Sequence, residues 1–309
     1  MTEIMDATGI SVKGLSKQFD KIQALNQVTT TIQKGSIFGL IGSNGAGKST
    51  FLRLLAGIYR PDAGQILIDG QPVYENDALK QRLFYISDDQ FYFPNSNMEE
   101  MAKYFSVMYQ RFSYEKFREL TELFRLDSKR KLNTFSKGMQ KQAHIILALS
   151  CQPDYLFCDE TFDGLDPVMR KLVKSIIADE VARGNITPVI ASHNLSELED
   201  FCDHIALLHK SDLVVEADID DIKLGIHRVQ AVFENDISEA DLAGLEIRDF
   251  TNRGRLTSFI VRGSEEMVKQ TLGERAPVYL ELLPLTLDEI FVCEMEGKGY
   301  DFSKLDIGR

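Results

Sequence analysis

The sequence predicts an α/β core with a mixed sheet and a helical subdomain, followed by a small α+β domain. Three observations lead to this fold class. Short apolar segments with strand character alternate with helical patterns through residues 1–225. The strand patterns stop over residues 97–150, where apolar side chains recur at helical spacing. After residue 225 the patterns run strand, helix, strand, strand, helix, strand, which is the order of a ferredoxin-like unit.

The expected core strands are short apolar segments, namely 10–12, 28–32, 37–41, 65–68, 83–86, 155–158, 188–191 and 204–208. The segment 155–158 is apolar throughout, as expected of a strand that is buried on both faces. The helical subdomain contains two apolar stripes, one of Met98, Met101, Ala102, Phe105 and Met108, the other of Phe117, Leu120, Leu123 and Phe124. Each stripe has the spacing of one helix face. We expect the methionine-rich first stripe to pack in the core.

The last part of the chain is expected to form strands over 228–233, 246–250, 255–261 and 278–282, and helices over 238–242 and 265–272. Asn252-Arg253-Gly254 is a hairpin signal between the two middle strands. Thr286 and Glu289 form a capping box that starts a final helix. We therefore expect an α/β domain over 1–225, a ferredoxin-like domain over 226–295 and a tail over 296–309.

Composition narrows the functional classes. The chain has 309 residues, with 35 Lys and Arg against 47 Asp and Glu, so its net charge is −12. An acidic chain without a basic block is a poor candidate for binding nucleic acid. No apolar run reaches the length of about 18 residues that a membrane span needs, and the first residues lack a signal-peptide pattern. We expect a cytoplasmic protein that meets a membrane only through a partner. The four scattered cysteines are expected to be reduced core residues.

A glycine-rich loop carries the first functional signal. Residues 42–50 read Gly-Ser-Asn-Gly-Ala-Gly-Lys-Ser-Thr and lie between an apolar strand and a helical pattern. Glycines permit close approach of the backbone, and successive N–H groups at a helix N-terminus bind phosphate. Lys48 is placed to reach the β- and γ-phosphates, and Ser49 to ligate Mg²⁺. The loop thus predicts a P-loop NTPase core whose nucleotide contacts are Ser43, Asn44, Gly45, Ala46, Gly47, Lys48, Ser49 and Thr50.

Polar residues follow two further apolar strands. Asp159 and Glu160 come directly after one strand, and His193 after another. Since ligands gather at the carboxyl ends of parallel strands, these side chains are expected near the loop. Asp159 suits a Mg²⁺ site, and Glu160 suits a base that activates water. The alternatives are solvated acids in a strand-end turn and a histidine that only caps its strand.

Five motifs in one order resemble the nucleotide-binding domain of ABC transporters over residues 10–217. They are Gly42–Thr50, Phe135-Ser136-Lys137-Gly138-Met139-Gln140, Leu156–Glu160, Gly164-Leu165-Asp166 and His193. The resemblance implies ATP as the nucleotide, Glu160 as the catalytic base and His193 as a sensor of the γ-phosphate. It also implies that two such domains enclose two ATP molecules, as a homodimer or a heterodimer.

The resemblance assigns further residues. Phe19 resembles the aromatic residue that stacks on adenine, although a core phenylalanine is the alternative. Ser136 and Gly138 resemble the signature that contacts the γ-phosphate of the other subunit, and the alternative for Ser136 is an ordinary helix cap. Asp166 is implied to lie across the dimer interface.

Two departures from the family pattern stand out. The family signature Leu-Ser-Gly-Gly-Gln is Phe135-Ser136-Lys137-Gly138-Met139 here. Lys137 adds a positive charge near the γ-phosphate, which would help binding; the alternative is that it faces solvent. Asp88 occupies the position of the family's Q-loop glutamine, where an acid can contact Mg²⁺ or its water. Both departures, and the ending over residues 285–291, resemble an exporter branch whose ATPase and membrane subunits are separate chains.

These observations predict an ATPase that binds MgATP as a dimer and drives export through a separate transmembrane permease. The subunit would lie on the inner face of the cell membrane through this partner. The resemblance implies that residues 91–94 lie where the membrane subunit docks, and exposed aromatic side chains would suit that contact; the alternative is that they are buried in the helical subdomain. One alternative is the ATPase of an importer with a C-terminal regulatory domain. Another is an ATP-dependent switch outside transport that acts on DNA or ribosomes, which the acidic charge disfavours.

Overall fold

The structure is a computed structural model, and it describes residues 9–234, 237–242 and 244–297. The contacts within the chain separate two units, Met1–Glu216 and Ala217–Arg309. Each unit has a hydrophobic core of its own. The boundary expected between residues 225 and 226 lies after α8 (Ile219–Gly225), which belongs to the second unit.

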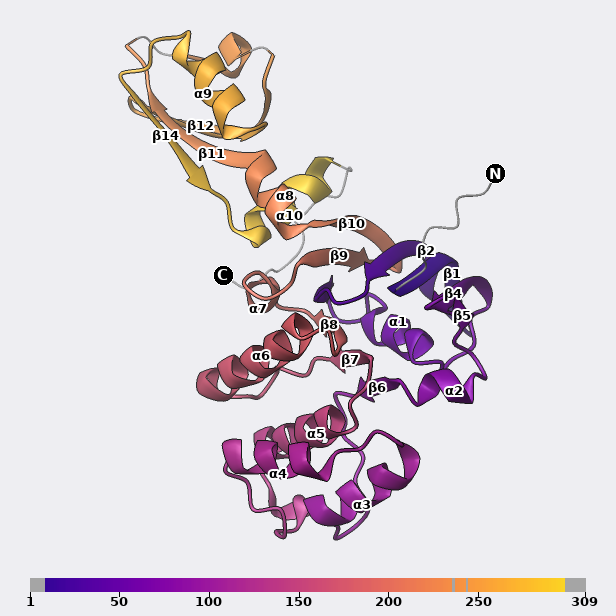
Figure 1. Ribbon diagram of the computed structural model, residues 1–309. Coiled ribbons are helices and arrows are strands. Elements are labelled where there is room, and N and C mark those ends of the chain that lie inside the picture. Colours follow the sequence, from indigo (N-terminus) through magenta and orange to yellow (C-terminus); the bar gives the residue numbers. More distant parts are fainter. Residues whose placement is uncertain (1–8, 235–236, 243, 298–309) are drawn as a thin grey trace. The chain divides into compact units, whose positions relative to one another are not determined.

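Two sheets form the first unit (Figure 1). A four-stranded sheet has the order β2-β1-β4-β5, with antiparallel pairs, and consists of β1 (Gly9–Phe19), β2 (Ile22–Gln33), β4 (Ala63–Ile68) and β5 (Gln71–Pro72). A six-stranded sheet has the order β10-β9-β3-β8-β7-β6. Its strands are β3 (Phe38–Ile41), β6 (Leu83–Ile86), β7 (Tyr155–Asp159), β8 (Thr187–Ser192), β9 (His204–His209) and β10 (Asp212–Asp218). The pairs from β9 through β6 are parallel, so the carboxyl ends of these strands share one edge.

Helix α1 (Lys48–Leu55) joins the two sheets into one core. Its Phe51, Leu52, Leu54 and Leu55 are all buried and belong to the same apolar cluster as side chains of both sheets. The other helices of this part are α2 (Asp77–Lys80), α6 (Pro167–Ala182) and α7 (Leu195–Leu198). The mixed α/β architecture predicted from the alternating patterns is confirmed.

The segment between β6 and β7 is helical, as predicted. It contains α3 (Met98–Met108), α4 (Tyr114–Leu123), a 3₁₀ turn η1 (Leu132–Thr134) and α5 (Lys137–Ser150). These elements lie together at one end of the first unit (Figure 1). Met98 and Met101 at the start of α3 are fully buried, whereas Met108 at its end is half exposed. The methionine stripe therefore packs in the core along its first half.

The second unit has the predicted ferredoxin-like order. Its elements after α8 are β11 (Ile226–Val232), η2 (Glu239–Leu242), β12 (Glu246–Arg253), β13 (Leu256–Arg262), α9 (Glu265–Gly273), β14 (Tyr279–Pro284) and α10 (Leu287–Gly297). The sheet is antiparallel with the order β12-β13-β11-β14, and residues of η2 and α9 pack in its core. The helix expected over 238–242 is a 3₁₀ turn. The capping box of α10 forms, because Glu289 accepts from the Thr286 N–H at 2.9 Å and Thr286 accepts from the Glu289 N–H at 3.3 Å.

Among the described residues, no helix combines the length and the apolar character needed to cross a membrane. The four cysteines are buried. Most of the tail expected over 296–309 lies outside the described residues.

Candidate active site

The phosphate loop connects the end of β3 to the start of α1. Gly47 precedes α1 with a φ of 110°, and a Cβ atom there would lie 2.3 Å from the carbonyl oxygen of Ala24. At Gly42 a Cβ atom would lie 2.4 Å from the carbonyl oxygen of Leu208. These two positions therefore accept only glycine, which brings the backbone of the loop close to the sheet.

Lys48 is the first residue of α1, and its side chain is buried. Its Nζ atom donates to the carbonyl oxygens of Gly42 at 2.7 Å and Ser43 at 3.4 Å. It also lies 3.1 Å from Oε1 of Glu160. The ammonium thus sits between the loop and the strand end that carries the predicted base.

Ser49 and Asp159, two of the three residues expected to contact Mg²⁺ or its water, are in contact with each other. Ser49 Oγ donates to Asp159 Oδ1 at 2.9 Å, and Tyr85 on the neighbouring strand β6 donates from its hydroxyl to Asp159 Oδ2 at 2.7 Å. Burial and the negative charge of Asp159 raise the pKa of Tyr85 above its usual value, so this hydroxyl remains a donor at neutral pH. Tyr85 was not singled out in the sequence, since only the pairing of β6 with β7 brings it to Asp159.

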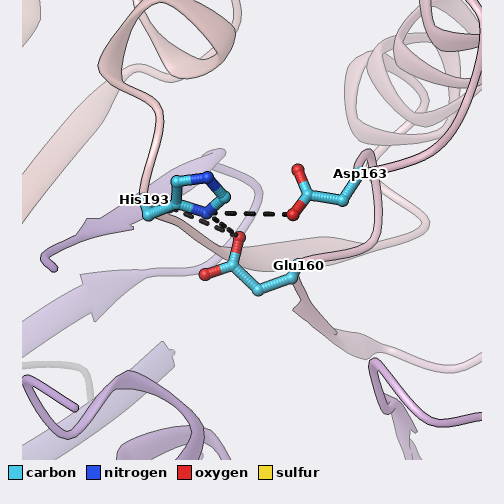
Figure 2. Close-up of side chains that lie close together, drawn as sticks. All are labelled: Glu160, Asp163 and His193. Carbon is cyan, nitrogen blue, oxygen red and sulfur yellow. Dashed lines mark hydrogen bonds and ion pairs between the residues drawn. The ribbon is translucent and has the colours of Figure 1, made fainter. Parts of the chain in front are cut away.

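Glu160 and His193 form the contact expected of residues at the ends of adjacent strands. His193 Nδ1 lies 2.9 Å from Oε2 of Glu160, and Asp163 Oδ2 lies 3.8 Å from the same nitrogen (Figure 2). The Glu160 carboxylate therefore lies between Lys48 on one side and His193 on the other. Asp163, which the sequence analysis did not select, adds a second carboxylate beside the imidazole.

The backbone of Glu160 is unusual. Its φ is 46°, in the left-handed region that costs a residue with a Cβ atom about 1–3 kcal/mol. Its N–H donates to the carbonyl oxygen of Ala191 in β8 at 3.1 Å, and its own carbonyl accepts from Lys141 Nζ at 2.8 Å. Two neighbouring elements therefore hold the peptide groups on either side of this residue.

Asp88 lies beside Lys141. Its Oδ1 is 3.0 Å from Lys141 Nζ, and the Asp88 side chain is largely exposed, whereas that of Lys141 is largely buried. Lys141 was also missed by sequence reasoning. Its position in the sequence could have pointed to it, because it lies three residues after Gly138, on the same face of α5. We call α5 the signature helix, since it begins within the signature residues 135–139.

The remaining predicted residues do not join this cluster through their described contacts. Ser136 caps α5 by accepting from the Met139 N–H at 3.2 Å, and Asp166 caps α6 by accepting from the N–H groups of Val168 and Met169, both at 3.0 Å. Lys137 is exposed at the start of α5. Phe19, at the end of β1, is 39% exposed and packs edge-on against Tyr59.

Gly138 links two of the motifs within the chain. A Cβ atom at this position would lie 2.9 Å from the carbonyl oxygen of Gly164. The signature helix and the loop before α6 are therefore packed backbone against backbone, so a residue larger than glycine would separate them.

The combined geometry suits phosphate chemistry. A buried ammonium and a helix N-terminus favour phosphate oxygens, a hydroxyl and a carboxylate offer oxygens to a hard cation, and a second carboxylate contacts an imidazole. This set of groups is able to hold a nucleoside triphosphate and to accept a proton from water.

Comparison with known proteins identifies the family. A family model described as "ABC transporter" matches residues 25–163. The chain is 31% identical over 289 residues to the ABC transporter ATP-binding protein YtrB of Bacillus subtilis, covering 94% of this chain and 99% of that protein. It is 29% identical over 301 residues to the Nod factor export ATP-binding protein I of Rhizobium sp. strain N33, covering 93% and 97%.

Solved structures show the same fold. An ATP-binding subunit of an ABC transporter superposes with a TM-score of 0.68 at 23% identity, over 93% of this chain and 100% of that chain. A dimeric ATP-binding cassette, MJ0796, bound to ADP and Pi superposes with a TM-score of 0.61 at 21% identity, over 68% and 98%. Together with the full-length likeness to YtrB, these matches show that the chain belongs to the ATP-binding subunits of ABC transporters.

Proposed function

We propose that this subunit binds MgATP as a dimer and hydrolyses it to power export through a separate transmembrane permease. The observation that carries the catalytic assignment is the position of the Glu160 carboxylate, in contact with both Lys48 and His193. In this arrangement Lys48 binds the β- and γ-phosphates, Glu160 accepts a proton from the attacking water, and His193 hydrogen-bonds the γ-phosphate. The loop residues from Ser43 to Thr50 surround the phosphates.

The donor set fits Mg²⁺. Ser49 Oγ and Asp159 Oδ1 are hard oxygen ligands that lie 2.9 Å apart, and Tyr85 orients the second oxygen of Asp159. We propose that Ser49 and Asp159 would hold the ion, and that bound Mg²⁺ would offset phosphate charge there. A contact of Asp88 with the ion or its water stays a prediction, because the described partner of this carboxylate is Lys141.

The second half of the nucleotide site is proposed to come from another cassette. The N-terminus of α5 carries Ser136, Lys137 and Gly138, and the described hydrogen bond of Ser136 serves only its own helix. In an isologous dimer, this helix end would face the phosphates bound by the partner, with Asp166 across the interface. The dimeric form of the related cassette MJ0796 supports this arrangement. Phe19 is exposed enough to stack on the adenine.

A groove offers a contact for the permease. It has a volume of about 740 Å³ and is lined by Phe91, Tyr104, Phe105, Met108 and His144, among others. Phe91 is 64% exposed, and Phe93 and Tyr104 are also exposed. An aromatic, partly apolar groove suits a helix of the membrane subunit, which would hold the ATPase on the inner face of the membrane.

Export is the direction that the relatives and the sequence favour. The relative from Rhizobium is named as an export protein, and the chain has Asp88 and the Phe-Ser-Lys-Gly-Met signature of the branch that it resembles. The test is transport in inside-out vesicles that contain the subunit and its permease. ATP-driven accumulation in the vesicle lumen without a substrate-binding protein supports export, and ATP-driven release of substrate from preloaded vesicles would show an importer.

The substitution Glu160→Gln tests the mechanism. We expect the variant to bind ATP, to hydrolyse it about 10²- to 10⁴-fold more slowly, and to accumulate as an ATP-bound dimer. Phosphate release and size-exclusion chromatography measure the two effects. Glu119→Gln, at an exposed position of α4, is the control and should leave both unchanged. Turnover near the wild-type rate in Glu160→Gln would remove Glu160 as the base.

A further inference from the structure

A buried lysine connects three parts of the active site. Lys141 lies on the signature helix α5, its side chain is 10% exposed, and its Nζ atom makes two described contacts. One is to Asp88 Oδ1 at 3.0 Å, and the other is to the carbonyl oxygen of Glu160 at 2.8 Å. Asp88 lies after β6 and Glu160 after β7, so a single ammonium joins the helical subdomain to two strand ends of the core sheet.

The contact with Glu160 falls on a backbone that needs support. The φ of Glu160 is in the left-handed region, which a residue with a Cβ atom does not favour by itself. Contacts with neighbouring elements must therefore hold the peptide group that follows it. The Ala191 carbonyl holds the N–H side, and Lys141 holds the carbonyl side. The direction of the Glu160 side chain follows from this backbone orientation, and the carboxylate reaches Lys48 and His193 from it.

The contact with Asp88 neutralises the buried charge. An ammonium with little exposure is costly unless it is paired and hydrogen-bonded, and Asp88 supplies the negative partner while the Glu160 carbonyl supplies a second acceptor. The carboxylate at the Q-loop position and the ammonium on α5 therefore neutralise each other.

We propose that Lys141 is a positioning residue that, together with Asp88, sets the orientation of the catalytic Glu160. The inference rests on the proposed role of Glu160 as the base. It assigns Asp88 to an ion pair with the signature helix, which makes the geometry of the base depend on where that helix lies. A small shift of α5 would therefore lower the rate of hydrolysis more than it lowered the affinity for the nucleotide bound by the same chain.

Four variants of the full-length chain test the proposal, Lys141→Met, Lys141→Arg, Asp88→Asn and the double variant Asp88→Asn/Lys141→Met. A misplaced catalytic group costs up to about 100-fold in rate, so we expect Lys141→Met to lower kcat about 10- to 100-fold with KM for ATP changed less than about threefold. Lys141→Arg should recover most of kcat, since it keeps the charge. Lys171→Gln, at an exposed position of α6, is the control and should behave as wild type.

The double variant shows whether Asp88 acts through its ion pair with Lys141 or as a ligand of Mg²⁺. If Asp88 acts through Lys141, the double variant is no slower than Lys141→Met, because the two effects do not add. The Mg²⁺ concentration for half-maximal activity then stays that of wild type in Asp88→Asn. Asp88→Asn changes an exposed side chain, so it tests the proposal even if Lys141→Met fails to fold.

Two results would overturn the inference. One is a wild-type kcat in Lys141→Met. The other is an effect of Asp88→Asn that keeps its full size in the Lys141→Met background and raises the Mg²⁺ requirement, which would assign Asp88 to the metal. Glu160→Gln, assayed alongside, keeps the two questions apart. If Glu160→Gln is inactive while the Lys141 variants are normal, only the positioning role fails; if Glu160→Gln is active, the base assignment itself is wrong.

Discussion

Two glycines of the phosphate loop have similar backbones but different surroundings. Gly45 has a φ of 82°, and a Cβ atom there would meet nothing within 4 Å. Gly47 has a φ of 110°, and a Cβ atom would lie 2.3 Å from the Ala24 carbonyl oxygen. The Gly45→Ala substitution therefore adds backbone strain alone, whereas Gly47→Ala adds strain and a collision.

We predict that Gly45→Ala lowers the free energy of unfolding by about 1–2 kcal/mol, the cost of a left-handed residue with a Cβ atom. Gly47→Ala should lower it by more and should also abolish ATP binding, because the loop must move away from β2. Urea denaturation and a fluorescent-nucleotide titration measure these effects. Equal effects of the two substitutions would show that the collision is relieved without cost.

Sequence reasoning found the residues whose role depends on local spacing. Lys48, Ser49, Asp159, Glu160 and His193 lie in motifs or at strand ends, and the parallel sheet places them at one edge. Tyr85 and Lys141 act through side chains that cross between elements, and the sequence near each carries no mark of its partner. Such contacts depend on strand order and helix position, which local patterns do not contain.

Helix α5 contains a histidine whose protonation opposes folding. His144 is buried against Phe84, Tyr92 and Phe105, and its Nδ1 has no hydrogen-bond partner within the described part of the chain. Burial lowers its pKa from 6.5 to about 4. Between these values the unfolded chain binds a proton that the folded chain does not, so the free energy of unfolding falls as the pH falls.

At about 1.4 kcal/mol per pH unit, this effect amounts to about 3 kcal/mol between pH 6.5 and pH 4. We predict that His144→Phe, which suits the aromatic surroundings, removes this part of the acid sensitivity. Urea denaturation of both proteins at pH 7 and pH 5 measures the difference. An identical pH dependence in the variant would show that the histidine protonates as readily in the folded chain as in the unfolded one.

Some strands are longer than predicted or were not predicted at all, and their sequences lack a regular alternation of apolar and polar residues. Strands β1 and β2 pair over more residues than expected, with register shifts between Val12 and Leu15 and again beyond Leu15. Such bulges break the alternation by which a strand is recognised. Strand β10 was not predicted, because only its middle residues are buried and its flanks are polar. The hairpin after β12 and the capping box of α10 were predicted well because each depends on a few adjacent residues.

At the scale of the whole molecule, the division into two units predicts separable folding. Each unit has its own core, so deletion of residues 226–309, which removes the sheet and core of the second unit and leaves α8, should leave a chain that folds and binds ATP. Circular dichroism and nucleotide titration test this expectation. If the C-terminal unit is only an appendage, the truncated chain should also co-purify with the permease, and loss of that complex would assign the unit to assembly.

The contacts of Lys48 have a consequence for affinity. An ammonium has three donors, and Gly42, Ser43 and Glu160 supply three acceptors, so a phosphate oxygen is admitted only by exchange. The carboxylate is the acceptor that can leave, since the other two belong to the loop backbone. Glu160 is thus a competitor of the substrate that it later helps to cleave. We expect Glu160→Gln to bind ATP more tightly even as a monomer, measured by calorimetry, whereas an unchanged monomer affinity would show that the exchange has no net cost.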